Sequence, residues 1–205
     1  RDPRLHYTLV VPYSIFDFNK TTYAPIPYYP KSKAGANNTG LRARKYVDYS
    51  DHYVNNISGV NPIIIRYADI LLMEAEALVE SGNYDEAYVS SLVNEVRQRP
   101  SVMMPKVEDV EGTGLSQDDL RQIIRHERRV EFALEGLRIF DIKRWEIGEE
   151  AYSDAYGYNP GKLTGSSAEY DLYLYQTREF DSADGYLWPI PKSELDANKL
   201  INGGE

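Results

Sequence analysis

Two glutamates four positions apart, Glu127 and Glu131, are the sharpest candidates for chemistry in this 205-residue sequence. A helical advance of about 100° per residue places both on the apolar face of Ile123 and Ile124. Side chains at positions i and i+4 have Cβ atoms about 5–6 Å apart, which is compatible with the carboxylate pair of a retaining glycosidase. One interpretation is therefore a pair of carboxyl groups that hydrolyses a glycosidic bond.

Arginines in and beside the same helical region support a structural interpretation of the two glutamates. A buried carboxylate is costly unless a cation pairs with it. A neighbouring guanidinium keeps the carboxyl ionised, whereas a general acid needs a raised pKa. We expect Glu127 and Glu131 to be buried and paired with arginines such as Arg66, Arg97 or Arg138.

Other reactive side chains are scarce. Cysteine is absent, and His6, His52 and His126 are scattered along the chain, so we predict no catalytic residue, no metal site and no cofactor. The acidic turn at 181–185 lacks a correctly spaced downstream glutamate for a calcium loop. A formal net charge of -9 without a basic run argues against nucleic acid as a partner. No stretch of about 18 apolar residues could span a bilayer as a helix.

Tyrosine is frequent, with 18 residues in the chain. Two groups lie in loop-like stretches beside asparagine and aspartate, where rings could stack on pyranose faces and short polar groups could bind hydroxyls. We predict ligand contacts first at Tyr23, Tyr28 and Tyr29, because neighbouring prolines stiffen that segment and reduce the entropy lost on binding. Tyr156 and Tyr158 are the second choice. Packing could explain any one of these tyrosines.

The predicted elements that position these residues fall into three zones of one mainly α domain. Residues 1–61 are loop-rich with minor β structure, and short strands are expected at 5–11 and 41–49. Residues 62–148 follow a helical period and form the core. Residues 149–205 are again loop-rich and are expected to pack on the helices.

Four helices are predicted within the helical zone. The first ends at Gly82, a typical C-terminal glycine, and the third runs from Ser116, in a near variant of the capping box, to Gly136. The first two form a hairpin similar to a tetratricopeptide unit. No second copy follows at a period of about 34 residues, so an ordinary helix pair is an equal interpretation. The fourth helix should direct Phe140 and Trp145 inward.

Trp188 is predicted to anchor the C-terminal zone on the helices. It lies between Leu187 and Pro189, where the prolines force an extended chain. We expect a large ring in such a segment to be buried, and its truncation to alanine would then cost about 3–5 kcal/mol.

Stretches spread over nearly the whole chain carry a resemblance to a known family. They are IRYADILLMEAEAL at 65–78, VNEVRQR at 93–99, the region 124–145 with its ERR and EGLRIFDIKRW runs, and LWPIP at 187–191. DPRL at 2–5 matches a common upstream element. In this order they resemble the signature of SusD/RagB-type outer-membrane lipoproteins.

The resemblance implies the C-terminal portion of a longer protein with a tetratricopeptide-like helical scaffold and long loop-rich excursions. The N-terminal portion would hold the signal, a lipidated cysteine and most of the helices. Members lie on the surface of the outer membrane, bind glycans or other nutrients, act as lids on TonB-dependent SusC-like transporters and are not enzymes. The matched motifs are scaffold residues, which supports structural roles for Glu127 and Glu131.

Two alternatives from other functional classes remain open. A glycoside hydrolase would use Glu127 and Glu131, and would need them exposed with one raised pKa. A helical-repeat adaptor for peptides would need a concave helix face lined by rings.

Overall fold

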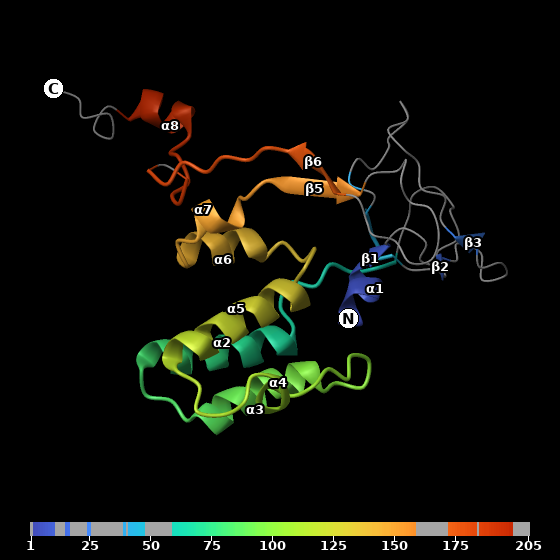
Figure 1. The fold of residues 1–205 in the computed structure, drawn as a ribbon. Helices are drawn as coiled ribbons and strands as arrows, with labels where there is room; N and C mark the ends of the chain where they lie inside the picture. Colours follow the sequence, from blue (N-terminus) through green and yellow to red (C-terminus); the bar gives the residue numbers. More distant parts are fainter. Residues whose placement is uncertain are drawn as a thin grey trace.

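Helices dominate the computed structural model of the chain, and its strands are short (Figure 1). This confirms the mainly α fold class. The residues that the structure describes are 2–10, 15–16, 24–25, 39, 41–47, 59–158, 172–183 and 185–198.

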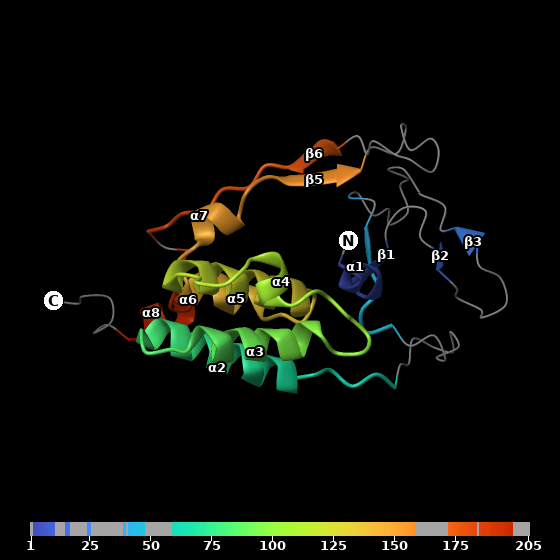
Figure 2. The ribbon, with the colours of Figure 1, turned by 60° about the horizontal axis from the view of Figure 1, so that its bottom comes forward.

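Three helices, α2 (Tyr67–Ser81), α3 (Glu86–Arg97) and α5 (Gln117–Glu131), pack side by side as the core (Figures 1 and 2). Each turns an apolar stripe toward the other two, because its apolar residues recur at helical spacing. The short helix α4 (Val107–Val110) packs on α3. Burial of this apolar surface is the main force that holds the three helices together. The largest fully buried apolar side chains are Leu72, Val79, Val89, Val93, Val96, Val107, Leu120 and Ile124.

Local signals set the ends of the core helices. α2 ends at Gly82, whose φ of 72° is a left-handed conformation that glycine adopts without strain. α5 begins with a full capping box, because the Ser116 hydroxyl accepts from the Asp119 N–H and the Asp119 carboxylate accepts from the Ser116 N–H. α5 ends at Glu131, before the end predicted at Gly136. Gly136 lies in the connection that follows, with a φ of 82°.

Two short helices, α6 (Arg138–Arg144) and α7 (Gly148–Ala151), follow α5. Ile142 of α6 is buried and Trp145 is half-buried. Phe140 is 57% exposed, so the prediction that it points inward is wrong. The physical reason is geometric, since Phe140 lies two positions, or about 200° around the helix, from the inward-facing Ile142.

The strands lie outside the helical core. The β5–β6 hairpin extends from α7 toward the end of the molecule at which α1 lies (Figures 1 and 2). The antiparallel pairs are β1 (Leu9–Val10) with β4 (Arg42–Ala43), β2 (Ile15–Phe16) with β3 (Ala24–Pro25), and β5 (Ala155–Tyr158) with β6 (Leu172–Gln176).

The first residues of the chain form a helix, α1 (Arg4–Thr8), so the predicted strand at 5–11 is wrong in its first half. The Asp2 carboxylate accepts from the backbone N–H of Arg4 at 2.9 Å, and the Arg4 side chain is buried. The Arg4 side chain also binds Glu127 and Glu131, far away in the sequence, and these tertiary contacts override the local apolar alternation. The strand expected at 41–49 is reduced to the two residues of β4.

The C-terminal segment is anchored by Phe180 and not by Trp188. Trp188 is 65% exposed, with the Lys143 ammonium 4.5 Å from its ring centroid, so the prediction that it is buried is wrong. The Phe180 ring instead lies between those of Tyr152 and Tyr186, at centroid distances of 5.3 and 4.8 Å. A short helix, α8 (Lys192–Ala197), follows this segment. Local sequence could not show which aromatic ring reaches α7, because that choice depends on the path of the chain.

Candidate functional site

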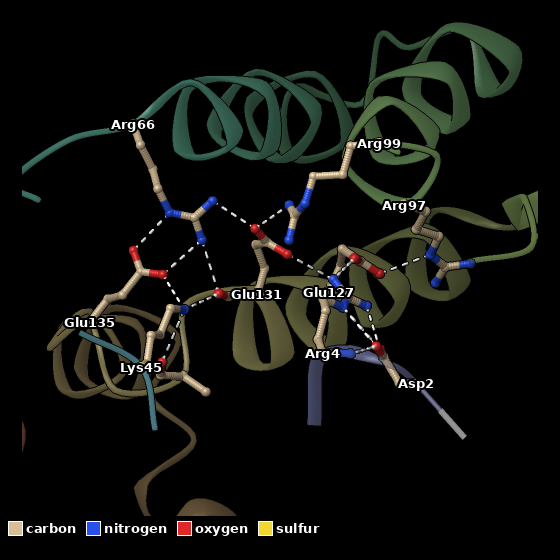
Figure 3. Close-up of polar contacts among 10 residues, drawn as sticks. Asp2, Arg4, Lys45, Arg66, Arg97, Arg99, Glu127, Glu131 and Glu135 are labelled. Carbon is tan, nitrogen blue, oxygen red and sulfur yellow. Dashed lines mark hydrogen bonds and ion pairs between the residues drawn. The ribbon is translucent and has the colours of Figure 1, made fainter. Parts of the chain in front are cut away.

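The glutamate pair lies on the buried face of α5, where it continues the apolar stripe of Ile123 and Ile124. Glu127 is 0% exposed and Glu131 is 3% exposed, as predicted. Figure 3 shows both carboxylates pointing into a group of cations that come from α1, from the start of α2 and from the end of α3.

Glu127 is held by two guanidiniums. The Nε of Arg97 donates to Glu127 Oε2 at 2.8 Å, and the Nη1 of Arg4 binds the other carboxylate oxygen. All three side chains are buried. Removing either arginine would leave the Glu127 carboxylate less compensated and away from water. Breaking such a buried pair is therefore strongly destabilising, even where the intact pair adds little net stability.

Glu131 is held by three guanidiniums. Its carboxylate accepts from Arg66 at 2.6 Å and from Arg4 at 3.0 Å, and it also pairs with Arg99. Burial by itself would raise the pKa of Glu131, but the hydrogen bonds from Arg99, Arg4 and Arg66 outweigh burial and lower the pKa to about 2. Glu131 therefore stays ionised and cannot protonate a leaving group near neutral pH.

The cluster continues along the chain to Glu135. The Nε of Arg66 donates to Glu135 at 2.8 Å, while the Nζ of Lys45 donates to the backbone oxygen of Glu131 at 2.9 Å and pairs with the Glu135 carboxylate. These bonds fix the turn that follows α5. We call the whole group the arginine–glutamate cluster; it consists of Asp2, Arg4, Lys45, Arg66, Arg97, Arg99, Glu127, Glu131 and Glu135 (Figure 3).

The predicted partners of the glutamates are confirmed for Arg66 and Arg97. Arg138 has no ion pair with either glutamate in the described part of the chain, so that choice is wrong. Sequence reasoning missed Arg4, which lies more than 120 positions before its carboxylate partners. No local signal marks such a pairing; the DPRL element was recognised only through the resemblance.

A second buried network ties α6 to the core. Arg128 donates to Asp69 of α2 at 2.8 Å and to Asp141 of α6 at 3.1 Å. These three side chains are buried. Within the described residues no group of histidines or acids is arranged to hold a metal ion. Both networks are sets of paired charges that hold helices and loops in place.

The tyrosines predicted to bind ligand are placed only in part. Tyr23, Tyr28 and Tyr29 lie outside the described residues. Tyr156 lies on β5 and is 56% exposed, opposite Leu174 in the register of the hairpin. Tyr158 lies opposite the 55% exposed Leu172, and its own side chain is outside the description.

The hairpin therefore carries an exposed apolar strip on one face. Opposed residues of an antiparallel pair point to the same side, as do residues two apart, so Tyr156, Leu172 and Leu174 share this face. Tyr175, 40% exposed, is on the other. A ring that is free on one face in this setting can stack on an apolar ligand face such as that of a pyranose.

A groove of about 660 Å³ lies between α3 and the region of α4, and sequence reasoning did not predict it. Its walls carry short polar side chains, such as Ser90 and Asn94. The acids are already engaged: Glu86 accepts from the Gly114 N–H at 2.9 Å, and Glu108 accepts from the Asn94 amide at 2.7 Å. The groove offers space for small polar molecules, but Glu86 and Glu108 are already hydrogen-bonded to neighbouring residues of its walls.

Comparison with known proteins shows what kind of scaffold these networks build. The profile described as "SusD family" matches residues 1–202. This chain belongs to the SusD family. SusD-like protein P2 of Formosa agariphila is 36% identical over 161 residues, which are 77% of this chain and 28% of that protein. SusD-like protein P38 of the same organism is 35% identical over 145 residues, which are 65% of this chain and 28% of that protein.

A solved structure supports the same assignment. The crystal structure of a SusD-like protein from Bacteroides fragilis superposes with a TM-score of 0.76 at 30% identity, over 98% of this chain and 38% of that one. This SusD-family chain therefore spans less than half the length of the relatives that it matches. The likeness confirms the SusD-like helical scaffold. In the part of the chain that the structure describes, no helix is long and apolar enough to cross a membrane.

Family membership also explains the two networks. The stretches that carried the resemblance supply Arg4, Arg66, Arg97, Glu127 and Glu131, which meet in the arginine–glutamate cluster. The motifs thus mark the residues that hold the scaffold together.

Proposed function

We propose that the protein to which this chain belongs is a cell-surface glycan-binding protein that takes up a polysaccharide or oligosaccharide as a nutrient. Membership of the SusD family over residues 1–202 is the observation that carries the proposal. The protein would act at the outer membrane, held by a lipid anchor in its N-terminal portion. It would hand its ligand to a TonB-dependent SusC-like transporter.

The proposed mechanism is binding without bond cleavage. The glycosidase alternative needs an open carboxyl pair with one raised pKa. Glu127 and Glu131 are instead buried, each paired with arginines, and the pKa of Glu131 is lowered to about 2. These facts count against a glycosidase that uses Glu127 and Glu131.

Exposed aromatic side chains are the proposed ligand contacts. Tyr156 is the candidate that the structure describes in most detail, and its neighbours on the apolar strip would extend the stacking surface. Tyr158, Tyr23, Tyr28 and Tyr29 remain candidates on the grounds given by the sequence.

The proposal is tested with the full-length protein on a glycan array, followed by native gel electrophoresis through gels that contain each polysaccharide bound on the array. Retardation by a polysaccharide supports the proposal. Tyr156→Ala should weaken the retardation, whereas Tyr88→Ala on α3, which removes an exposed ring from a helix, should not. Absence of binding to any glycan would contradict the proposed function. Retention of full affinity by Tyr156→Ala would contradict only the choice of site.

The role in delivery needs a separate test. Purification of the protein from its native membrane should yield a TonB-dependent transporter in stoichiometric amount. Recovery of the protein alone under conditions that preserve membrane complexes would contradict this part of the proposal.

A further inference from the structure

Three neighbouring arginines, Arg125 and Arg129 of α5 and Arg138 of α6, form no ion pair with a described residue. The arginines around them are all engaged. Arg121 pairs with Glu80, and Arg144 pairs with Glu76 and Asp141. A cation that forms no ion pair with a described acid, where its neighbours all form one, is available for an external anion.

Two of the three guanidiniums converge on one ring. The Cζ of Arg125 lies 4.9 Å from the centroid of Trp145, and the Cζ of Arg138 lies 5.9 Å from it. Arg129 is one turn beyond Arg125 on α5, so the two project from the same side of the helix. The indole attracts both cations through its ring face, which orders them without neutralising their charge.

Burial makes this arrangement costly without an anion. The Nε of Arg125 is the one buried side-chain nitrogen or oxygen of the described residues without a hydrogen-bond partner. Burial, together with repulsion by Arg129, lowers the pKa of Arg138. Asp141 and Glu150 act on Arg138 in the opposite direction, but neither forms an ion pair with it in the described chain.

We propose that Arg125, Arg129 and Arg138 form an anion site for a carboxylate or sulfate group carried by a glycan. Guanidinium forks match the oxygens of both groups and bind them more strongly than a neutral donor would. In a chain with a net charge of -9, such a site would be a local exception at which an acidic sugar could dock. This inference rests on the proposed function and gives it a substrate class, acidic glycans.

The test compares two matched pairs of polymers with the full-length protein by isothermal titration calorimetry. One pair is polygalacturonate and its methyl ester; the other is a sulfated galactan and its desulfated form. Variants are Arg129→Gln and Arg138→Gln, with Lys106→Gln as a control that removes an exposed charge beside α4. Melting temperatures are measured in parallel, and Arg138→Lys tests whether charge alone restores binding.

We expect the acidic member of at least one pair to bind more tightly than its neutral form. Arg129→Gln and Arg138→Gln should each weaken that binding roughly tenfold, while Lys106→Gln leaves it unchanged. The melting temperature should not fall in Arg138→Gln, because that change relieves repulsion. The polymer pair in which the acidic member binds more tightly shows whether the site binds a carboxylate or a sulfate group.

Three results would overturn the anion site: no acidic polymer bound, equal affinity for the two members of both pairs, or wild-type affinity in both arginine variants. Binding of neutral glycans in any of these cases would leave the proposed glycan-binding function intact. Failure of every glycan, acidic or neutral, would count against that function as well.

Discussion

At the residue scale, the two glutamates of α5 show how the same spacing can serve catalysis or structure. The difference lies in what surrounds them. Glu127 and Glu131 face guanidiniums from three other segments, and the pKa of Glu131 is lowered to about 2. Their role is to neutralise and position Arg4, Arg66, and the arginines at the end of α3.

Replacing one of the buried carboxylates should be severely destabilising. Glu131→Gln leaves three guanidiniums facing a neutral amide, and breaking a buried pair costs about 3–5 kcal/mol. The free energy of unfolding, measured by urea titration, should fall by that amount. The matched control is Asp118→Asn, which removes the exposed partner of Arg121 and should change stability little. Equal effects of the two changes would show that the cluster is not structural.

The lowered pKa of Glu131 predicts a dependence of stability on pH. The pKa falls from its ordinary 4.5 in the unfolded chain to about 2 in the folded one. The stabilisation is therefore complete above pH 4.5 and is lost as the pH falls toward 2, by about 3 kcal/mol. Urea titrations between pH 6 and 2 should show this loss, and Glu131→Gln should show a smaller one. An identical slope in both proteins would contradict the assignment.

At the element scale, a few glycines decide where elements can approach. An added Cβ at Gly148 would lie 2.2 Å from the Phe180 ring, so the first residue of α7 must be glycine for the C-terminal segment to pack there. The backbone N–H of Gly148 also donates to the Tyr186 hydroxyl at 3.0 Å. This contact, and not Trp188, fastens the segment.

Gly148→Ala should loosen the C-terminal segment. The clash forces Phe180 out of its place between Tyr152 and Tyr186, at a cost of about 1–3 kcal/mol. Hydrogen exchange at residues 178–187 should accelerate, and the melting temperature should fall. Gly59→Ala, where a Cβ meets nothing within 4 Å, is the control. Unchanged exchange in Gly148→Ala would mean that Phe180 is not the anchor.

The helices that could be predicted from the sequence are those that depend on local signals. Helical periodicity and the caps at Gly82 and Ser116 were enough for α2, α3 and α5. The helix α1, by contrast, depends on Arg4 reaching Glu127 across the fold, and local alternation indicated a strand instead. The same limit applies to the site, since the exposure of Tyr156 and the groove beside α3 follow from how elements pack.

At the scale of the whole molecule, the arginine–glutamate cluster joins segments that are far apart in the sequence. Arg4, Lys45 and Arg66 each bring a separate stretch to the C-terminal half of α5 or the turn after it. The cluster thus links the N-terminal segment to the helical core by charge pairs. Exposed loops can vary on such a scaffold without disturbing it.

Arg4→Ala should release the N-terminal segment from the core. It removes the cation that Glu127 and Glu131 share and leaves both carboxylates less compensated. Amide hydrogen exchange at residues 5–10 should accelerate strongly, whereas exchange in α2 should change less. Protection equal to that of the wild type would show that the pairing contributes nothing to docking.

The protein is proposed to bind a glycan without cleaving it. Binding and the absence of cleavage are tested together by calorimetric titration of the full-length protein with a polysaccharide that retards it in a native gel. The predicted result is a saturable heat of binding that returns to baseline after each injection. A sustained heat after each injection, as expected of continuing hydrolysis, or no heat and no binding at any temperature, would contradict it.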